Sequence, residues 1–281
     1  MTVAREAVED QAALWNGAAG VTWVEAQEPL DRLFKPFEDL LVESVVAKGA
    51  RHVLDVGCGT GATTLAIARS LAGGGSCTGV DISEPMLALA RARAERERVP
   101  AAFVCADAQI HAFEPAAFDL IVSRFGVMFF EDSVRAFANL RRTARRNTEI
   151  ELIVWRSPAE NPFMTAAERA AAPLLPDLPP RRSDGPGQFA FADTRRVRGI
   201  LERSGWAEID FRPLDVPCSF ARADLIDYVT RIGPVGRALR AADGPTRARV
   251  TEAVLRAFDP YLDGAEVRFV AACWLIGARF A

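Results

Sequence analysis

The chain of 281 residues has little of what metal-bound and disulfide-linked proteins depend on. Its five cysteines stand singly, and none belongs to a C-x-x-C pair. Isolated cysteines indicate neither a zinc site nor a disulfide framework, and most are expected to be small apolar residues of the core. The sequence therefore predicts no metal.

Excess charge and long apolar runs are also missing. The chain has 34 Lys and Arg against 37 Asp and Glu, a net charge of -3, which argues against nucleic acid as a partner because phosphate binding needs a basic excess. The longest nearly continuous apolar run, residues 269–278, is far shorter than the roughly 20 residues of a membrane-spanning helix, and is expected to be a buried strand. Residues 1–11 are charged where a secretory signal is apolar. We expect no membrane span and a cytoplasmic location.

The elements that are present alternate between strands and helices. Strands are expected at 52–56, 77–80, 102–106, 118–122 and 150–155, and helices at 63–71, 83–98 and 133–145, the second helix with Ser83 as its N-cap. This rhythm predicts an α/β protein with a parallel, doubly wound sheet. The ligand crevice of such a sheet lies beyond the carboxyl ends of its strands.

The second half of the chain is less regular. Residues 172–187 are rich in proline and are expected to form an irregular connection or lid. A helix capped by Asp193 should precede one strand over 206–220, either long or broken at Pro213 and Pro217. Helices over 224–242 and 246–258 and a last strand over 267–280 follow. Because the helical block lies between two strands, we expect it to be inserted into the last hairpin, over the crevice.

Residues 53–61 combine an expected strand with the turn Gly-Cys-Gly-Thr-Gly. Gly57, Gly59 and Gly61 let the backbone turn tightly and approach a ligand, and the following helix offers its N-terminal amides. The glycines alone are equally consistent with any nucleotide cofactor and with a purely structural turn.

Three aspartates narrow the choice of cofactor. Asp55 lies two residues before the first glycine, where it would repel a pyrophosphate but tolerate a sulfonium cofactor with a free ammonium. Asp81 ends the second strand, placed for ribose hydroxyls, and Asp107 ends the third, where it can accept from the amine of adenine. Singly, Asp81 and Asp107 are explained as well by an aspartate that bonds its own backbone at a loop start. Together with the glycines, the three favour S-adenosylmethionine.

At these residues the chain resembles the class I S-adenosylmethionine-dependent methyltransferases, and among them the bacterial ubiquinone and menaquinone biosynthesis branch. The motifs are residues 53–61, 79–83, 106–108 and 118–130, and the resemblance is good over roughly residues 14–161. It implies a Rossmann-like, seven-stranded sheet with a reversed last strand. It also implies that the methionine part of the cofactor lies on the glycine loop, its ribose on Asp81 and its adenine near Ile82, Asp107 and Ala108. The residues predicted to bind S-adenosylmethionine, or its product S-adenosylhomocysteine, are Trp15, Trp23, Asp55, Gly57, Cys58, Gly59, Gly61, Asp81, Ile82, Met86, Asp107, Ala108 and Ser123.

The resemblance also suggests a division of the chain. We expect one structural domain with elaborations: an N-terminal helical cap at 1–50, a cofactor-binding core at 51–156, an irregular lid at 157–192 and a C-terminal part at 193–281 with its helical insertion at about 222–262. Trp15 and Trp23 belong to the cap. A tryptophan there would shield the sulfonium through a cation–π contact worth about 0.5–2 kcal/mol, although packing of a helix onto the sheet explains both residues equally well.

Two departures from the family pattern bear on the site. A Pro-Gly-Gly turn commonly precedes the fifth strand, whereas residues 145–149 here are Arg-Arg-Asn-Thr-Glu. Asn147 can adopt a left-handed conformation, so the turn can persist in another form. Neither an Asn-Pro-Pro-Tyr nor a Pro-Cys motif follows the fourth strand, as in nucleic-acid methyltransferases, which favours a small-molecule acceptor.

Catalytic residues are hard to identify. Methyl transfer is an in-line displacement in which alignment alone supplies roughly 7–11 kcal/mol, and a base is needed only if the acceptor must lose a proton first. His111, Arg124 and Tyr228 are weak candidates. An exposed loop position explains His111 at least as well, a structural ion pair explains Arg124, and core packing explains Tyr228. The predicted function is methyl transfer to an O, N or C atom of a small molecule. A non-catalytic S-adenosylmethionine-binding protein and, less favoured, an NAD(P)-dependent oxidoreductase are the alternatives, and the oligomeric state is left open.

The role given to Asp81 can be tested by calorimetric titration with S-adenosylmethionine. The change Asp81→Ala should weaken binding by a few kcal/mol at most, because hydrogen bonds to a charged group contribute about 1.5–3 kcal/mol each. An affinity equal to that of the unchanged protein would refute the ribose assignment.

Overall fold

The computed structural model describes residues 10–71, 73–179 and 185–280. Its sheet contains the seven strands expected, in the order β3-β2-β1-β4-β5-β8-β6, and the two-residue β7 pairs with β8. The strands are β1 (His52–Val56), β2 (Ser76–Asp81), β3 (Ala101–Cys105), β4 (Phe118–Arg124), β5 (Ala144–Trp155), β6 (Ala207–Ala221), β7 (Leu262–Asp263) and β8 (Glu266–Arg279). Strands β1 to β5 are parallel, and β8 runs antiparallel between β5 and β6. The predicted doubly wound sheet with a reversed last strand is confirmed.

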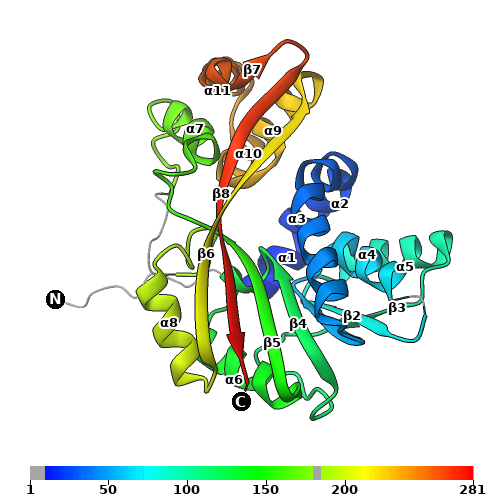
Figure 1. The fold of residues 1–281 in the computed structure, drawn as a ribbon. Helices are drawn as coiled ribbons and strands as arrows, with labels where there is room; N and C mark the ends of the chain where they lie inside the picture. Colours follow the sequence, from blue (N-terminus) through cyan, green and yellow to red (C-terminus); the bar gives the residue numbers. More distant parts are fainter. Residues whose placement is uncertain (1–9, 72, 180–184, 281) are drawn as a thin grey trace.

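Helices cover both faces of the sheet (Figure 1). One face carries α3 (Gln27–Lys48), α4 (Ala62–Ser70) and α5 (Glu84–Glu97), and the other α6 (Ser133–Thr143) and α8 (Thr194–Arg203). Asp193 caps α8 as expected, its side chain accepting from the amides of Arg195 and Arg196. Because both faces are covered, the central strands are almost wholly apolar, as in Val53, Leu54 and Val56 of β1.

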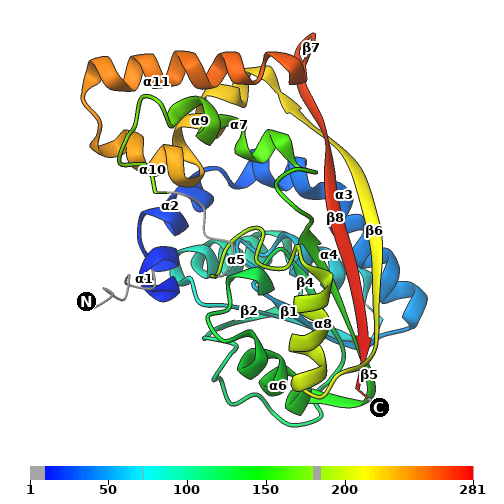
Figure 2. The same cartoon turned by 90° about the vertical axis from the view of Figure 1, so that its left-hand side faces the viewer.

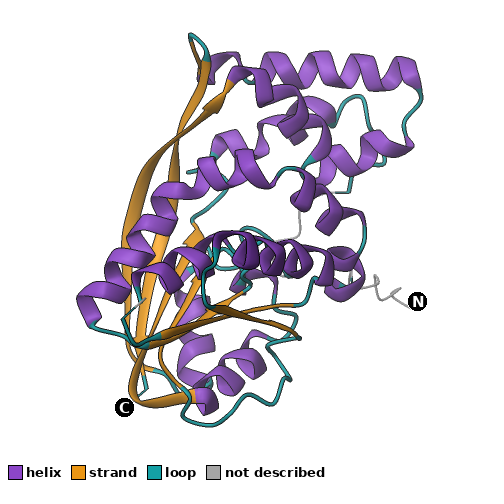
Figure 3. Cartoon of the chain, turned by 90° about the vertical axis from the view of Figure 1, so that its right-hand side faces the viewer, coloured by secondary structure: helices purple, strands orange, loops and turns teal. Residues whose placement is uncertain are grey.

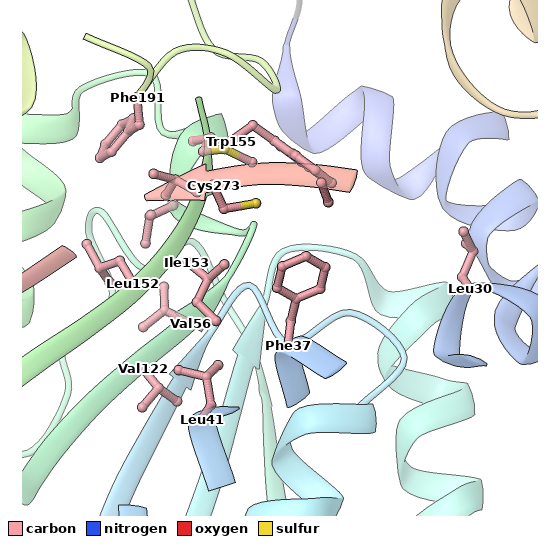
Figure 4. Packing of buried hydrophobic residues seen from close by; sticks show 14 of the residues in the cluster. Leu30, Phe37, Leu41, Val56, Val122, Leu152, Ile153, Trp155, Phe191 and Cys273 are labelled. Carbon is pink, nitrogen blue, oxygen red and sulfur yellow. The ribbon is translucent and has the colours of Figure 1, made fainter. Parts of the chain in front are cut away.

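The core joins α3 to the carboxyl-terminal halves of the strands. Figure 4 shows Phe37 and Leu41 of α3 beside Val56, Val122 and Ile153 of three neighbouring strands. Phe37, Leu41, Val122 and Ile153 are at most 1% exposed. The N-terminal cap is thus part of the hydrophobic core and not a separate unit. It is completed by α1 (Gln11–Asn16) and α2 (Ala18–Glu25).

The helical insertion lies between the last two long strands, but its helices differ from those expected. The segment predicted as one helix over 224–242 is divided into α9 (Leu225–Arg231) and α10 (Gly233–Ala241), followed by α11 (Gly244–Ala257). The division falls at Ile232, which is extended because Pro234 disfavours helical geometry just before it and Gly233 takes a φ of 76°. In Figure 2 these helices lie together at one end of the molecule, beyond α1 and α2, with α7 and the ends of the long strands β6 and β8 beside them. Figure 3 shows the same end from the opposite side, with helices covering the tips of the long strands.

The structure decides between the two alternatives left open for the strand over 206–220, and it corrects one further expectation. Strand β6 runs unbroken through Pro213 and Pro217, because it is the edge strand of the sheet and both prolines are exposed. The predicted irregular lid at 157–192 contains a helix, α7 (Pro162–Ala171), which packs against α11. Residues 1–9 of the expected cap and 180–184 of the expected lid lie outside the described residues. The domain boundaries stay a prediction.

Asn147 replaces the usual glycine turn as the sequence suggested. It is left-handed, with a φ of 67°, and its amide donates to Phe280 O at 2.8 Å. The turn is absorbed into β5, which therefore begins at Ala144 and not at residue 150, and the pairing of β4 with β5 shifts register between Phe118 and Leu120. Within the described ranges, no helix is both long and apolar enough to cross a membrane.

Asn161 should be a principal anchor of α7. This fully buried side chain donates to Ala272 O and accepts from Ala272 N, both at 2.9 Å, which ties the start of α7 to β8. The change Asn161→Ala leaves the amide of Ala272 without a partner, while Ala272 O keeps its hydrogen bond from Arg156 N at 3.0 Å. It should lower the free energy of unfolding by about 1–3 kcal/mol in urea titrations. The control Thr165→Ala, on the same helix, should change it by less than about 0.5 kcal/mol. Equal effects of the two changes would contradict this role.

Candidate functional site

One cavity, with a volume of about 360 Å³, lies at the carboxyl ends of the parallel strands. Its walls come from the ends of β1, β2, β4 and β5, from α1 to α3, and from the insertion helices α9 and α10. Ten of the thirteen residues predicted to bind the cofactor line it: Trp15, Trp23, Gly57, Cys58, Gly59, Asp81, Ile82, Met86, Asp107 and Ala108. The crevice therefore forms where the topology of the sheet predicts it.

The glycine loop is shaped by close contact between backbones. Gly57 has a φ of 70°, and a Cβ atom on it would lie 2.5 Å from the Cα of Gly126, on the loop after β4. Gly59 is also left-handed and faces the cavity. Gly61 was predicted to bind the cofactor but is not part of the cavity wall. Its missing side chain makes room for Ala90 of α5 and Phe103 of β3, to which a Cβ would approach within 2.8 and 3.1 Å.

Asp81 binds the glycine loop with the carboxylate that faces the cavity. Its Oδ2 accepts from Gly59 N at 2.7 Å, and its Oδ1 accepts from Ser83 N at 2.9 Å. Burial raises the pKa of Asp81, and hydrogen bonds from the backbone amides of Ser83, Gly59 and Ile82 oppose that rise. Each oxygen keeps a second lone pair, so the carboxylate can accept hydroxyl donors from a ligand while it holds the loop.

Asp107 combines the two roles that the sequence left open, a hydrogen bond to its own loop and a place at the ligand crevice. Its Oδ1 accepts from Gln109 N at 2.8 Å, as a loop-starting aspartate does, and it also lines the cavity. The side-chain amide of Gln109 donates through Nε2 to both carboxylate oxygens of Asp107 at 3.1 Å, and its Oε1 accepts from Asp132 N at 2.7 Å. Gln109 is a cavity residue that the sequence reasoning missed, since a polar residue in a loop carries no pattern of its own.

Two further predicted cofactor residues are buried behind the cavity wall. Asp55 is 1% exposed and accepts from Thr64 Oγ1 at 2.6 Å, while its other oxygen has no hydrogen-bond partner among the described residues. Ser123 is wholly buried, donates to Val56 O at 2.7 Å and accepts from the amides of Gly126 and Val127. Ser123 therefore joins the loops after β1 and β4, and direct contact of Asp55 or Ser123 with a cofactor is not supported by the geometry.

Side chains of the N-terminal cap and of α5 hold the cap over the loops that follow β1 and β2. Asn16 donates to Ile82 O at 2.9 Å and accepts from Glu84 N at 3.0 Å, so it caps α5. Ser83 occupies the predicted N-cap position but donates its hydroxyl to Trp15 O at 2.6 Å instead of capping the helix. Arg93 of α5 donates to Thr60 O at 2.8 Å and to Asp31 of α3 at 2.7 Å.

Both tryptophans of the cap have packing partners as well as a place in the cavity wall. Trp15 meets Phe129 edge to face, with the ring centroids 5.1 Å apart, and Trp23 stacks on Phe34 at 6.5 Å. Contact of either residue with a sulfonium stays a prediction.

The far end of the cavity is aromatic and basic. Phe163 stacks on Phe269 with the centroids 3.8 Å apart, and Trp155 stacks on Phe125 at 4.4 Å. All four rings line the cavity, as do Tyr228 of α9 and three arginines at positions 231, 237 and 240. Sequence reasoning predicted that the insertion lies over the crevice and named Tyr228 as a weak candidate there. It did not identify the other residues of this end, because α7 and the division of α9 from α10 were not expected.

Comparison with known proteins agrees with this geometry. A family model described as "Methyltransferase domain" matches residues 53–147. An uncharacterized protein of Mycobacterium tuberculosis is 31% identical over 216 residues, 72% of this chain and 76% of that protein. A demethylmenaquinone methyltransferase of Thermus thermophilus is 30% identical over 122 residues, 43% of this chain, and the chain spans 55% of its length. This chain belongs to the class I S-adenosylmethionine-dependent methyltransferases.

The fold is also found in solved structures. The YcgJ protein of Bacillus subtilis superposes with a TM-score of 0.56 at 17% identity, covering 86% of this chain and 97% of that protein. The likeness at this identity concerns the fold alone.

The three weak catalytic candidates occupy different places in this methyltransferase. His111 is not part of the cavity wall, and its ring meets Phe113 edge to face at 4.6 Å. Arg124 lines the cavity with its guanidinium 5.5 Å from the Phe34 ring, and its interaction with Asp31, Glu38 and Asp55 opposes the lowering of its pKa by burial. Arg124 thus has carboxylates of its own chain around it. Tyr228 lines the cavity beside Phe220, at a centroid distance of 5.0 Å.

Burial of Asp55 should make stability depend on pH in an unusual direction. Burial raises the pKa of this carboxyl from 3.8 to about 6, against the hydrogen bond from Thr64. The folded protein then keeps a proton that the unfolded chain releases, so the contribution of Asp55 to stability falls as the pH rises from about 4 to about 6, by roughly 3 kcal/mol.

The variant Asp55→Asn lacks this titration. Relative to that of the unchanged protein, its free energy of unfolding should increase as the pH rises through that window, measured by urea titration at a series of pH values. Asp227→Asn, which removes an exposed aspartate of α9, controls for the loss of a negative charge. A constant difference between Asp55→Asn and the unchanged protein would contradict the raised pKa.

Proposed function

We propose that this methyltransferase binds S-adenosylmethionine at the glycine-loop end of the cavity and methylates a small molecule at the aromatic end. The observation that carries the proposal is the continuity of the cavity. The same walls run from Gly57, Gly59 and Asp81 to Trp155 and Phe163. A donor and an acceptor held in one cavity can be aligned for displacement, which is the main contribution that a protein makes to this reaction.

The donor supplies an already activated methyl group on its sulfonium, and residues of the chain hold the rest of it. We assign the ribose to Asp81, whose carboxylate faces the cavity with lone pairs to spare. The adenine is assigned to the wall formed by Ile82, Asp107 and Ala108, and the methionine part to the glycine loop. The left-handed turn at Gly59 supports the last assignment, because it brings bare backbone to the cavity.

The residues at the acceptor end are suited to orienting an acceptor, whereas no histidine is placed there to remove a proton from it. Both histidines of the chain lie within the described residues, and neither His52 nor His111 lines the cavity. The stacked Phe163 and Phe269 and the stacked Phe125 and Trp155 offer flat apolar surfaces for a ring or an apolar chain. We therefore propose an acceptor whose nucleophilic atom needs no histidine base. A cytoplasmic location is proposed with it.

The function can be tested with S-adenosylmethionine labelled in its methyl group. The full-length protein, incubated with a bacterial extract, should transfer label to compounds that pass an ultrafiltration membrane, and the labelled product is identified by mass spectrometry. Asp81→Asn, at the same concentration, should give less product, because its side chain exchanges one acceptor oxygen for a donor.

The outcomes of this experiment separate the possible functions. Label found only in protein or nucleic acid would overturn the small-molecule proposal. Binding of the cofactor without any labelled product would favour the non-catalytic alternative.

A further inference from the structure

Most arginines of the cavity wall lie away from its carboxylates, and the exception is Arg124, which interacts with Asp31, Glu38 and Asp55. Among the residues that the structure describes, the carboxylates of the wall are Asp81 and Asp107, at the end assigned to the nucleoside, and Asp31, which forms an ion pair with Arg93 at 2.7 Å. Arg231, Arg237 and Arg240 all lie at the opposite end, on α9, α10 and the cavity side of the insertion. The two ends therefore suit ligand groups of different charge.

Helix α10 directs one of its faces into the cavity. Pro234, Arg237 and Arg240 follow one another at intervals of three residues and line the cavity, whereas Val235 and Leu239 are buried on another face. The packing of α10 thus determines which residues meet a ligand. Arginines whose only role was to keep this short helix soluble could lie on any exposed face of it. Both arginines instead lie on the face that lines the cavity.

The arginines differ in how their charge is compensated. Arg124, nearer the glycine loop, has Asp31, Glu38 and Asp55 around it. Arg231 forms an ion pair with Glu25 of the cap. Within the part of the chain that the structure describes, neither Arg237 nor Arg240 has a carboxylate within ion-pair distance. Arg237 is half-buried and Arg240 is exposed, so the pair forms the rim of the cavity.

We infer that the acceptor of this methyltransferase is a small molecule with an apolar, ring-sized body and an anionic group, a carboxylate or a phosphate, that Arg237 and Arg240 bind. The inference rests on the proposed function. The guanidinium fork matches both oxyanions through paired hydrogen bonds, and these are stronger where water is partly excluded. The body of the acceptor would lie against Phe163, Phe269 and Trp155, between the anion site and the donor.

The test uses three naphthalene probes, 2-naphthoate, 2-naphthyl phosphate and the neutral 2-naphthamide, titrated by calorimetry into the full-length protein saturated with S-adenosylhomocysteine. At least one of the two anions should bind roughly tenfold more tightly than the amide, because a charge-assisted hydrogen bond supports that preference. Comparison of the two anions decides between carboxylate and phosphate.

The variant Arg237→Gln should lose most of this preference, and Arg240→Gln should lose a smaller part because Arg240 is more exposed. Arg249→Gln is the matched control, since Arg249 is an exposed arginine of α11 outside the cavity wall, and it should keep the preference. All three variants should bind S-adenosylhomocysteine as the unchanged protein does, which shows that they are folded.

Equal affinities for the three probes, or an equal loss in Arg237→Gln and Arg249→Gln, would overturn the anion site. Failure of S-adenosylhomocysteine to bind the unchanged protein would instead overturn the proposed function, so the two failures are distinguishable.

Discussion

The close approach of two strand ends is the constraint on which the site depends. The turn after β1 and the loop after β4 meet at Gly57 and Gly126, where a Cβ atom on either residue would lie 2.5 Å from backbone atoms of the facing loop. Ser123 fixes this contact by binding the carbonyl of Val56 and two amides of the β4 loop. Asp81, at the end of β2, holds the amide of Gly59. Three strand ends thus form one rigid floor for the cavity.

The cap and the insertion complete the cavity from opposite sides of this floor. The cap is tied down through polar contacts, with Asn16 bound to Ile82 and Glu84, and Arg93 bridging Thr60 and Asp31. The insertion is held through β8, which carries Phe269 into the aromatic wall and binds Asn161 at the start of α7. The nucleoside end is therefore built largely from hydrogen-bonding groups of the core, and the acceptor end from rings and arginines of the insertion.

Buried charge in the floor is balanced locally. Asp55 lies beneath the glycine loop with one hydrogen bond, from Thr64, and burial raises its pKa. Burial also raises the pKa of Asp81, where three backbone amides oppose the rise. Arg124 supplies positive charge to these buried carboxylates, since Asp31, Glu38 and Asp55 all interact electrostatically with it. The acidic residues that the sequence places at the strand ends are thus stabilised by groups of the surrounding core.

The sequence by itself determined the sheet, the family and the nucleoside end, because these depend on local patterns: apolar runs that end in glycine or aspartate, spaced by helices. Even the left-handed Asn147 was predictable from its residue type. The sequence did not separate Asp55, Gly61 and Ser123, which support the loops, from residues that face the cavity, because a motif gives the order of residues but not the direction of their side chains. Only the tertiary structure decided that α7, absent from the expected elements, joins the wall through Phe163, and that Gly233 and Pro234 divide α9 from α10 and turn Arg237 inward. These features arise from contacts between segments far apart in the chain, such as Asn161 with Ala272, and such contacts leave no periodic trace in the sequence.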